Sequence, residues 1–336
     1  MRNHALRASL AGAGSGGLDL TGYTFQVTTA SPSTTFTLRT DEAVSYDVDW
    51  GDGDADAGVT SNAFPHTYAA AGTYTVTVES VASWALRHLD VAPDDLLVSA
   101  VIGAPSDFPW ATGILDAWRG CANITEFPAI NLSNVDLLAR CWFGCTGIIT
   151  FGDCDISNAT TLKNAWDGCS SMVDFSVTSD LSGVTVLREA WLNCSSLTAF
   201  PALTFGSVID CNATWSGCSS LTSFPLLDLD LCRYFINAWR NNSSLVNFPA
   251  GFFDTWNPSS VTDRCFQGSW DGCTSLSATS VENIFNSLDA SGVSTTIANN
   301  NIDVDYDAAT GTPSIATAVA NLKSRGWKPT LNGVVL

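Results

Sequence analysis

The chain is poor in positive charge. Its 336 residues contain 14 Lys and Arg against 33 Asp and Glu, so the formal net charge is −19. Only three of the basic residues are lysines, at Lys163, Lys323 and Lys328. A surface of this kind repels nucleic-acid phosphates and anionic lipid head groups. We therefore expect no nucleic-acid partner and no attraction to an anionic membrane.

Long apolar runs are also missing. No stretch approaches the roughly 20 apolar residues that cross a bilayer. The first residues, Met1 to Arg7, contain no apolar segment of signal-peptide length. We therefore expect no membrane insertion and no export through the general secretory route. Apolar residues nonetheless make up 46% of the chain, which indicates a large buried core.

Tryptophan, in contrast, recurs along the middle of the chain at a nearly constant interval. The steps between successive members are 24, 24, 25, 24, 24 and 31 residues. The seven positions are Trp118, Trp142, Trp166, Trp191, Trp215, Trp239 and Trp270. A fixed period of this length is typical of repeat architectures, in which each unit buries its apolar face against its neighbours. The sequence therefore predicts a solenoid.

Two positions just after each tryptophan have a constant chemical character. The second residue after it is always Gly or Asn, the two types that most readily adopt positive φ. These residues are Gly120, Gly144, Gly168, Asn193, Gly217, Asn241 and Gly272. The next position holds a small side chain, at Cys121, Cys145, Cys169, Cys194, Cys218, Asn242 and Cys273. We predict a left-handed corner in every unit, followed by an internal column of small groups against buried backbone.

Two further positions are apolar throughout. The first is occupied by Ile124, Ile148, Met172, Leu197, Leu221, Leu245 and Leu276. The second, nine residues after tryptophan, is occupied by Phe127, Phe151, Phe175, Phe200, Phe224 and Phe248. Stacking of the units would align each set into a continuous apolar column.

The repeat resembles the BspA-type leucine-rich repeats of bacterial surface proteins and of many phage-encoded proteins. The segment Leu221–Leu229, which reads LTSFPLLDL, is similar to the strand segment of that family. The resemblance covers roughly residues 111 to 276. It implies a parallel-stranded solenoid with a binding or scaffolding role, and it implies no chemistry.

A second motif lies upstream of the repeats. Tyr46–Gly53 reads YDVDWGDG, and it is followed by His66–Tyr68 and by Ala71–Val78. Tyr74–Val78 alternates with the period of a half-buried strand, and Gly51 with Gly53 indicates a tight turn. The motif resembles a polycystic-kidney-disease (PKD) domain. That resemblance implies an immunoglobulin-like β-sandwich acting as a spacer or adhesive module outside cells.

The ends complete the predicted organisation. Helices are expected near residues 280–288 and 314–325, in a cap over the last repeat. The fold class is therefore mainly β: a small immunoglobulin-like β-sandwich, a leucine-rich-repeat solenoid and a small α/β C-terminal cap. The predicted parts are a flexible or docking arm (1–17), the PKD-like β-sandwich (18–82), a linker and N-terminal cap (83–110), the solenoid (111–276) and the C-terminal cap (277–336).

Candidates for a metal site are weak. Asp52, Asp54 and Asp56 alternate as in a calcium loop, but Ala63 occupies the place of the closing acidic ligand, which favours a solvated acidic loop. Asp303, Asp305 and Asp307 would share one face of a strand, and an exposed polar face is the favoured interpretation. No Cys-x-x-Cys pair occurs, and no histidine lies in the repeats. We assign no metal and no cofactor.

Histidine and cysteine also indicate no catalytic site. His66 belongs to the PKD motif, and neither His4 nor His88 has a nucleophile or a partner acid at a recognisable spacing. The 11 cysteines are an odd number and mostly occupy one column, which favours reduced packing thiols. The alternative is oxidation between neighbouring coils among Cys141, Cys154, Cys211, Cys232 and Cys265. We expect no enzyme.

Both resemblances are to proteins found outside cells, yet we expect that this chain is not exported by the general secretory route. A virus particle resolves this conflict, because its proteins are assembled in the host cytoplasm and meet the exterior after lysis. We therefore expect a nonenzymatic structural and adhesive protein on the surface of a tailed bacteriophage particle, as a capsid decoration, head fibre or tail-associated fibre. The alternatives are a bacterial cell-surface adhesin and a glycan-degrading virion enzyme.

The expected partners are other virion proteins, further copies of the chain and a host-surface polysaccharide or protein. Polar residues that directly precede the repeat phenylalanines are the predicted ligand-binding positions: Glu126, Asp174, Ser223 and Asn247. Arg2 and Arg7 in the N-terminal arm are the predicted residues for docking to the particle. Many copies on one particle would strengthen a weak individual site.

Overall fold

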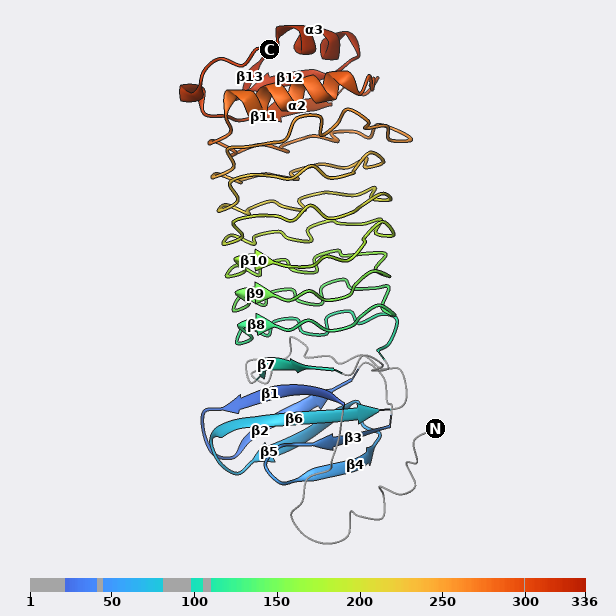
Figure 1. Cartoon of the computed structure of the whole chain (residues 1–336), viewed down its shortest axis with the longest axis vertical. Helices are drawn as coiled ribbons and strands as arrows, with labels where there is room; N and C mark the ends of the chain where they lie inside the picture. Colours follow the sequence, from blue (N-terminus) through green and yellow to red (C-terminus); the bar gives the residue numbers. More distant parts are fainter. Residues whose placement is uncertain (1–21, 41–44, 81–97, 105–109, 299) are drawn as a thin grey trace.

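The computed structural model describes residues 22–40, 45–80, 98–104, 110–298 and 300–336. Figure 1 shows an elongated molecule with three parts along its long axis. A β-sandwich lies at one end, stacked coils form the middle, and a small unit of helices and strands covers the other end. The predicted arm at residues 1–17 lies outside the described residues.

The sandwich contains two antiparallel sheets. Its strands are β1 (Tyr23–Thr29), β2 (Thr34–Arg39), β3 (Tyr46–Asp49), β4 (Ala55–Val59), β5 (Ala63–Tyr68), β6 (Gly72–Ser80) and β7 (Val98–Gly103). One sheet has the order β4-β3-β6-β1-β7, and β2 pairs with β5 in the other. Alternate residues of β1, namely Tyr23, Phe25 and Val27, are fully buried. The period of two thus places one face of the strand in the core between the sheets.

Strand β7 differs from the expectation for its segment. We predicted a linker and cap at residues 83–110, but Val98–Gly103 pairs antiparallel with β1 as the edge strand of the larger sheet. In Figure 1, β7 lies on the side of the sandwich that faces the first coil. A hydrogen bond of 2.7 Å from the Trp118 indole to the Tyr23 hydroxyl also joins these two parts. The core of the sandwich therefore continues into the core of the coils.

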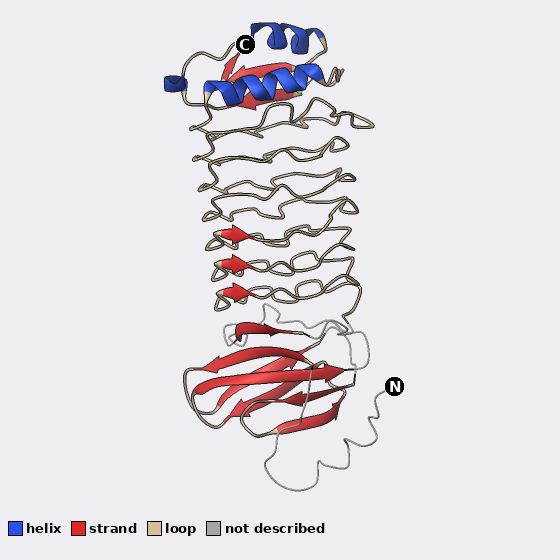
Figure 2. Cartoon of the chain, viewed as in Figure 1, coloured by secondary structure: helices blue, strands red, loops and turns tan. Residues whose placement is uncertain are grey.

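The coils stack in parallel register. Isolated parallel bridges link Gly113 to Leu137, Leu137 to Thr161 and Thr161 to Val186, and so onward along the stack. A second ladder contains the short strands β8 (Glu126–Phe127), β9 (Thr150–Phe151) and β10 (Asp174–Phe175). Most of each coil is irregular in Figure 2. Its backbone groups are paired between coils instead, as in the 2.8 Å bond from the Trp142 amide to the Ala165 carbonyl.

The predicted left-handed corners are confirmed. All seven Gly and Asn residues that follow tryptophan by two positions have φ between 59° and 78°. A second left-handed column, which we did not predict, lies two residues before each tryptophan, with φ between 51° and 65°. Its members are Asp116, Arg140, Asn164, Glu189, Ala213, Asn237 and Gly268. Each coil therefore turns sharply on both sides of its tryptophan.

The predicted internal columns are also confirmed, and the aromatic ones pack face to face. Neighbouring repeat tryptophans lie 5.0–6.2 Å apart with interplanar angles of 1–11°. The phenylalanine rings form a second column alongside the tryptophans. The ring centroids of Phe151 and Trp142 are 4.9 Å apart, and their planes make an angle of 86°. Such pairs stabilise by about 0.5–1.5 kcal/mol each beyond the area that they bury. The two columns, whose rings are roughly perpendicular to each other, form the core of the stack.

The cysteine column lies inside the stack, as predicted. All 11 cysteines are free and buried. The thiol of Cys169 donates a 3.2 Å hydrogen bond to the carbonyl of Trp142, and Cys194 bonds Trp166 in the same way. Burial raises the pKa of the Cys218 thiol to about 12. These thiols therefore act as small core groups that satisfy backbone carbonyls.

The C-terminal unit covers the last coil. Its elements are α2 (Ala278–Ala290), β11 (Asn301–Val304), η2 (Ala308–Thr310), α3 (Ala316–Ser324), β12 (Lys328–Leu331) and β13 (Val334–Val335). Both predicted helices are present, and the Ser277 side chain caps the first by accepting from the Ser280 amide. Ile284 and Phe285 of α2 are fully buried. A parallel bridge from Trp270 to Val304 joins the last coil to this unit.

Candidate functional site

The predicted ligand-binding residues lie on one exposed ladder of the stack. Glu126, Asp174, Ser223 and Asn247 are all exposed, and each precedes a buried phenylalanine. Parallel pairing aligns Glu126 and Asp174 on either side of Thr150, and a bridge aligns Ser223 with Asn247. We call this row the phenylalanine-edge ladder. Its role in ligand binding stays a prediction.

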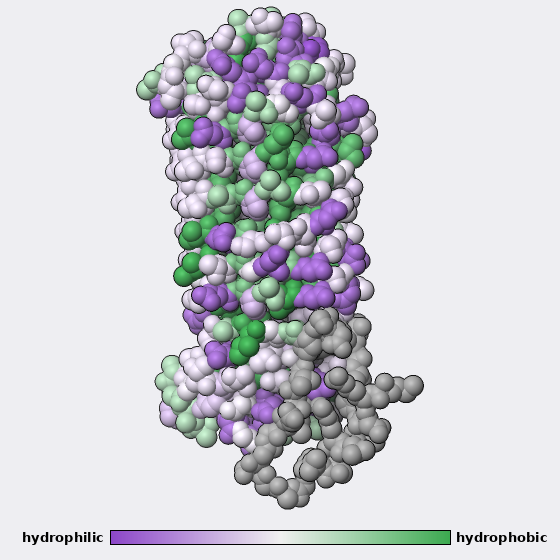
Figure 3. All heavy atoms as spheres, in the orientation of Figure 1, coloured by the Kyte–Doolittle hydropathy of each residue, from purple (hydrophilic) through white to green (hydrophobic). Residues whose placement is uncertain are grey.

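Aliphatic side chains that the sequence did not predict to be exposed accompany this ladder. Ile149, Val173 and Val246 each lie two residues before a repeat phenylalanine and are 46%, 43% and 39% exposed. Figure 3 shows hydrophobic residues among hydrophilic ones along the visible face of the stack. The ladder therefore offers apolar contact area beside hydrogen-bonding groups. That combination suits the faces of sugar rings as well as peptide surfaces.

Charged pairs elsewhere on the stack connect successive coils. Arg140 donates to both carboxylate oxygens of Asp116 at 2.8 and 2.7 Å. Arg188 lies 2.8 Å from Asp210 one coil further on. Bidentate geometry is the strong form of such a pair. These contacts connect adjacent coils.

Asp167 and Glu189 share one hydrogen-bond donor in the stack. The Asn164 amide donates to Asp167 at 3.0 Å and to Glu189 at 2.7 Å. Burial raises the pKa of Asp167 to about 6; the nearby Glu189 carboxylate also raises it, and the hydrogen bond from Asn164 opposes the shift. This carboxyl group therefore titrates well above the usual range of an aspartate.

The acidic residues near the C-terminus are arranged differently from the prediction. The strand β11 ends at Val304, and Asp307 instead caps the short helix η2 by accepting from the Ala309 amide. Asp303 and Asp305 are half-buried rather than fully exposed, and Asp305 accepts a 2.8 Å hydrogen bond from the Gly272 amide. Burial, followed by the charges of Asp303 and Asp305, raises the pKa of Asp271. The three predicted carboxylates thus serve separate structural contacts.

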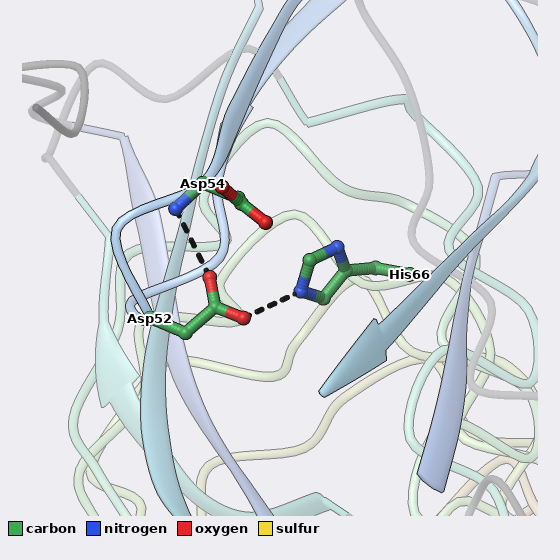
Figure 4. A group of neighbouring side chains, drawn as sticks. All are labelled: Asp52, Asp54 and His66. Carbon is green, nitrogen blue, oxygen red and sulfur yellow. Dashed lines mark hydrogen bonds and ion pairs between the residues drawn. The ribbon is translucent and has the colours of Figure 1, made fainter. Parts of the chain in front are cut away.

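A compact group in the sandwich does have metal-ligating character. Asp52 and Asp54 lie in the turn between β3 and β4, and His66 lies on β5 of the other sheet. One ligand atom of each residue lies within 4.8 Å of the others. Figure 4 shows the three side chains pointing toward a common space. The imidazole Nε2 of His66 is 2.8 Å from a carboxylate oxygen of Asp52.

The surrounding aromatic residues fix the imidazole. The ring of His66 stacks on that of Trp50, with 4.6 Å between the ring centroids and an interplanar angle of 6°. Tyr68 contacts the imidazole edge-on, with a centroid distance of 4.7 Å and an interplanar angle of 83°. Asp56, the third aspartate of the sequence pattern, lies outside the group because it accepts a 2.9 Å hydrogen bond from the Trp50 indole. The sequence indicates His66 only as a member of the PKD motif. Packing of the two sheets against each other brings His66 close to Asp54 and Asp52, which lie 12 and 14 positions earlier in the chain.

Several predicted residues cannot be placed. The docking residues Arg2 and Arg7, together with His4 and His88, lie outside the described residues. Within the part of the chain that the structure describes, no helix is long and apolar enough to cross a bilayer.

Comparison with known proteins identifies one part of the chain. The PKD domain family matches residues 21–91, which confirms the predicted PKD domain and with it an immunoglobulin-like sandwich. No curated protein and no solved structure matches the chain. The protein is thus mainly β, with an N-terminal PKD domain.

Proposed function

We propose that the chain is a nonenzymatic structural and adhesive protein on the surface of a tailed bacteriophage particle, and that its stack is a leucine-rich-repeat solenoid of the BspA type. The phenylalanine-edge ladder is the observation that carries this proposal. In each coil, the two residues that directly precede the repeat phenylalanine are exposed, and the stack repeats this pair along its axis. A ligand with a repeating structure, such as a surface polysaccharide, could contact several coils at once.

The PKD domain supports an adhesive role. Domains of this family are generally extracellular modules of adhesion type. Here the sandwich packs directly on the coils through β7 and through the Trp118–Tyr23 hydrogen bond. A module built in this way holds the ladder at a fixed distance from whatever anchors the N-terminal end.

Quantitative mass spectrometry of purified phage particles from the source culture tests the location. We expect the chain in a stoichiometric ratio to the major capsid protein, with a high copy number for a head protein and a low one for a tail protein. Its absence from particles, with recovery in the bacterial cell-envelope fraction, would replace the proposal by the alternative of a cell-surface adhesin.

The ladder itself is tested by binding of the purified chain to host cells and to their extracted polysaccharide. We expect the double variant Asp174→Ala with Ser223→Ala to bind at least tenfold more weakly than the original chain. Thr204→Ala is the matched control, because Thr204 is exposed on a different bridge of the same stack, opposite Asp180. Equal loss in both variants would contradict a site on the phenylalanine-edge ladder. Glycan cleavage during the assay would instead favour the third candidate, a virion enzyme.

A further inference from the structure

We propose that Asp52, Asp54 and His66 form a binding site for a divalent transition-metal ion of the zinc type. The three ligand atoms come from two different sheets, within 4.8 Å of one another. Two carboxylates and one imidazole are ligands that zinc accepts, and three protein ligands leave a further position open to water or to a partner. The site is independent of the proposed particle function.

The contacts of Asp54 distinguish this group from an ordinary acidic turn. Nearby aspartates each have a hydrogen bond that explains their place: Asp47 accepts from the Gly58 amide, and Asp49 accepts from the Gly51 amide. Asp52 accepts from the Asp54 amide and faces His66. The carboxylate of Asp54 has no hydrogen bond or ion pair to any described residue. It nonetheless points toward the Asp52–His66 pair (Figure 4), where a cation would be its natural partner.

The local charge also favours a bound cation. Five aspartates occur between Asp47 and Asp56, and no Lys or Arg occurs between residues 40 and 86. The His66 imidazole is therefore the only basic side chain of that segment. Carboxylates placed this close repel one another, and a divalent ion between Asp52 and Asp54 would remove that cost.

The nature of the ligands selects the ion. Calcium and magnesium take oxygen ligands, so an imidazole nitrogen disfavours both, whereas zinc readily combines imidazole with carboxylate. The stacking of His66 on Trp50 holds the ring in place before any ion arrives. Side-chain exposures of 11% for His66 and 17% for Asp52 leave access to solvent from one side. Coordination uses the lone pair of Nε2, so the imidazole proton must lie on Nδ1 in the bound state.

Isothermal titration of the full chain with zinc chloride, after removal of metals and under a reducing agent free of thiols, tests the site. We expect one saturable ion per chain, and no comparable binding of calcium at the same concentration. Asp54→Asn should weaken zinc binding at least tenfold, since loss of a direct ligand exceeds the 10- to 100-fold effects of outer partners. Asp254→Asn removes the same charge from an exposed position on the stack and should leave affinity unchanged.

Two further measurements keep the result interpretable. The absorption spectrum of the cobalt complex should lack thiolate charge-transfer bands, because the 11 cysteines are buried. Urea unfolding of Asp54→Asn without metal should match the original chain, which separates loss of a ligand from loss of the fold. Equal zinc affinity in Asp54→Asn and the original chain would overturn the proposal, as would binding that never saturates or a cobalt spectrum with thiolate bands.

Discussion

The stack and the sandwich bury similar residues by different means. In the stack, one set of contacts recurs from coil to coil. Trp142 stacks on Trp166, and the Cys169 thiol donates to the Trp142 carbonyl, as their counterparts do in neighbouring coils. In the sandwich, each contact occurs once. Trp50, for example, stacks on His66 and donates an indole hydrogen bond to Asp56. Repetition spreads the effect of a substitution over neighbouring coils, whereas the sandwich concentrates it at one place.

The largest expected effect tests this contrast at the centre of the stack. Trp166→Ala removes an indole that stacks on Trp142 and Trp191. We expect a loss of about 3–5 kcal/mol in the free energy of unfolding, measured by urea denaturation. Trp166→Phe is the control and should cost clearly less, because it keeps an aromatic ring in the column. Similar losses for both variants would show that the column does not depend on ring packing.

A pair of glycines in the same repeat position gives a smaller effect. A Cβ at Gly217 would lie 2.7 Å from the Asn193 side-chain oxygen, whereas one at Gly120 would meet nothing within 4 Å. Both residues have positive φ. We expect Gly120→Ala to cost about 1–2 kcal/mol through backbone strain alone, and Gly217→Ala to cost more. Gly206→Ala, with ordinary φ and its nearest neighbour at 3.9 Å, should be close to neutral in the same thermal-unfolding series. An equal cost at Gly120 and Gly217 would contradict the clash with Asn193.

Asn242 is the one interruption of the cysteine column, and its replacement should stabilise. Its side chain is fully buried, and neither its amide nitrogen nor its oxygen has a hydrogen-bond partner among the described residues. Asn242→Cys restores the group found in the other coils. We expect a gain of about 1–2 kcal/mol, the cost that buried unsatisfied polar groups carry. A calorimetric scan that shows a lower melting temperature would mean that Asn242 has a partner such as buried water.

The smallest expected effect is a pH dependence confined to one coil. Because burial raises the pKa of Asp167 to about 6, the folded state binds this proton more tightly than the unfolded chain does. The contribution of Asp167 therefore stabilises the protein at low pH and is lost as pH rises from about 4 to about 6. Asp167→Asn should remove this part of the stability profile, which urea midpoints at several pH values would show. An unchanged slope between pH 4 and 6 would assign the effect to other carboxyl groups.

The sequence predicted the repeated features better than the single ones. Gly217 and Asn193 belong to residue types that accept positive φ, so the first left-handed corner could be recognised in every coil. The second corner could not, because Arg140, Glu189 and Ala213 rarely adopt this conformation. Hydrogen bonds between coils impose it on them, as between the Arg140 amide and the Lys163 carbonyl.

Contacts between distant segments explain the remaining differences. The strand β7 pairs with β1 across more than 70 residues, whereas Pro93, Pro105 and Pro109 in the same segment favour a linker. His66 and Asp54 meet because strands of opposite sheets pack together, which no local spacing reveals. Glu126 and its counterparts could be identified as exposed from the phenylalanine period alone. The aliphatic neighbours Ile149 and Val173 could not, since apolar residues in a repeat predict burial.

The parallel arrangement of the coils has a mechanical consequence. The coils are stacked along the long axis of the molecule (Figure 1), and hydrogen bonds join each coil to the next. Tension applied to the two ends of the stack therefore acts on these bonds in series and releases one coil at a time. Each released coil of 24 residues would add about 80 Å of extended chain. Under a pulling force the protein should therefore lengthen in a series of similar small steps. It would absorb a sudden load as an extensible tether and shorten again when the force falls.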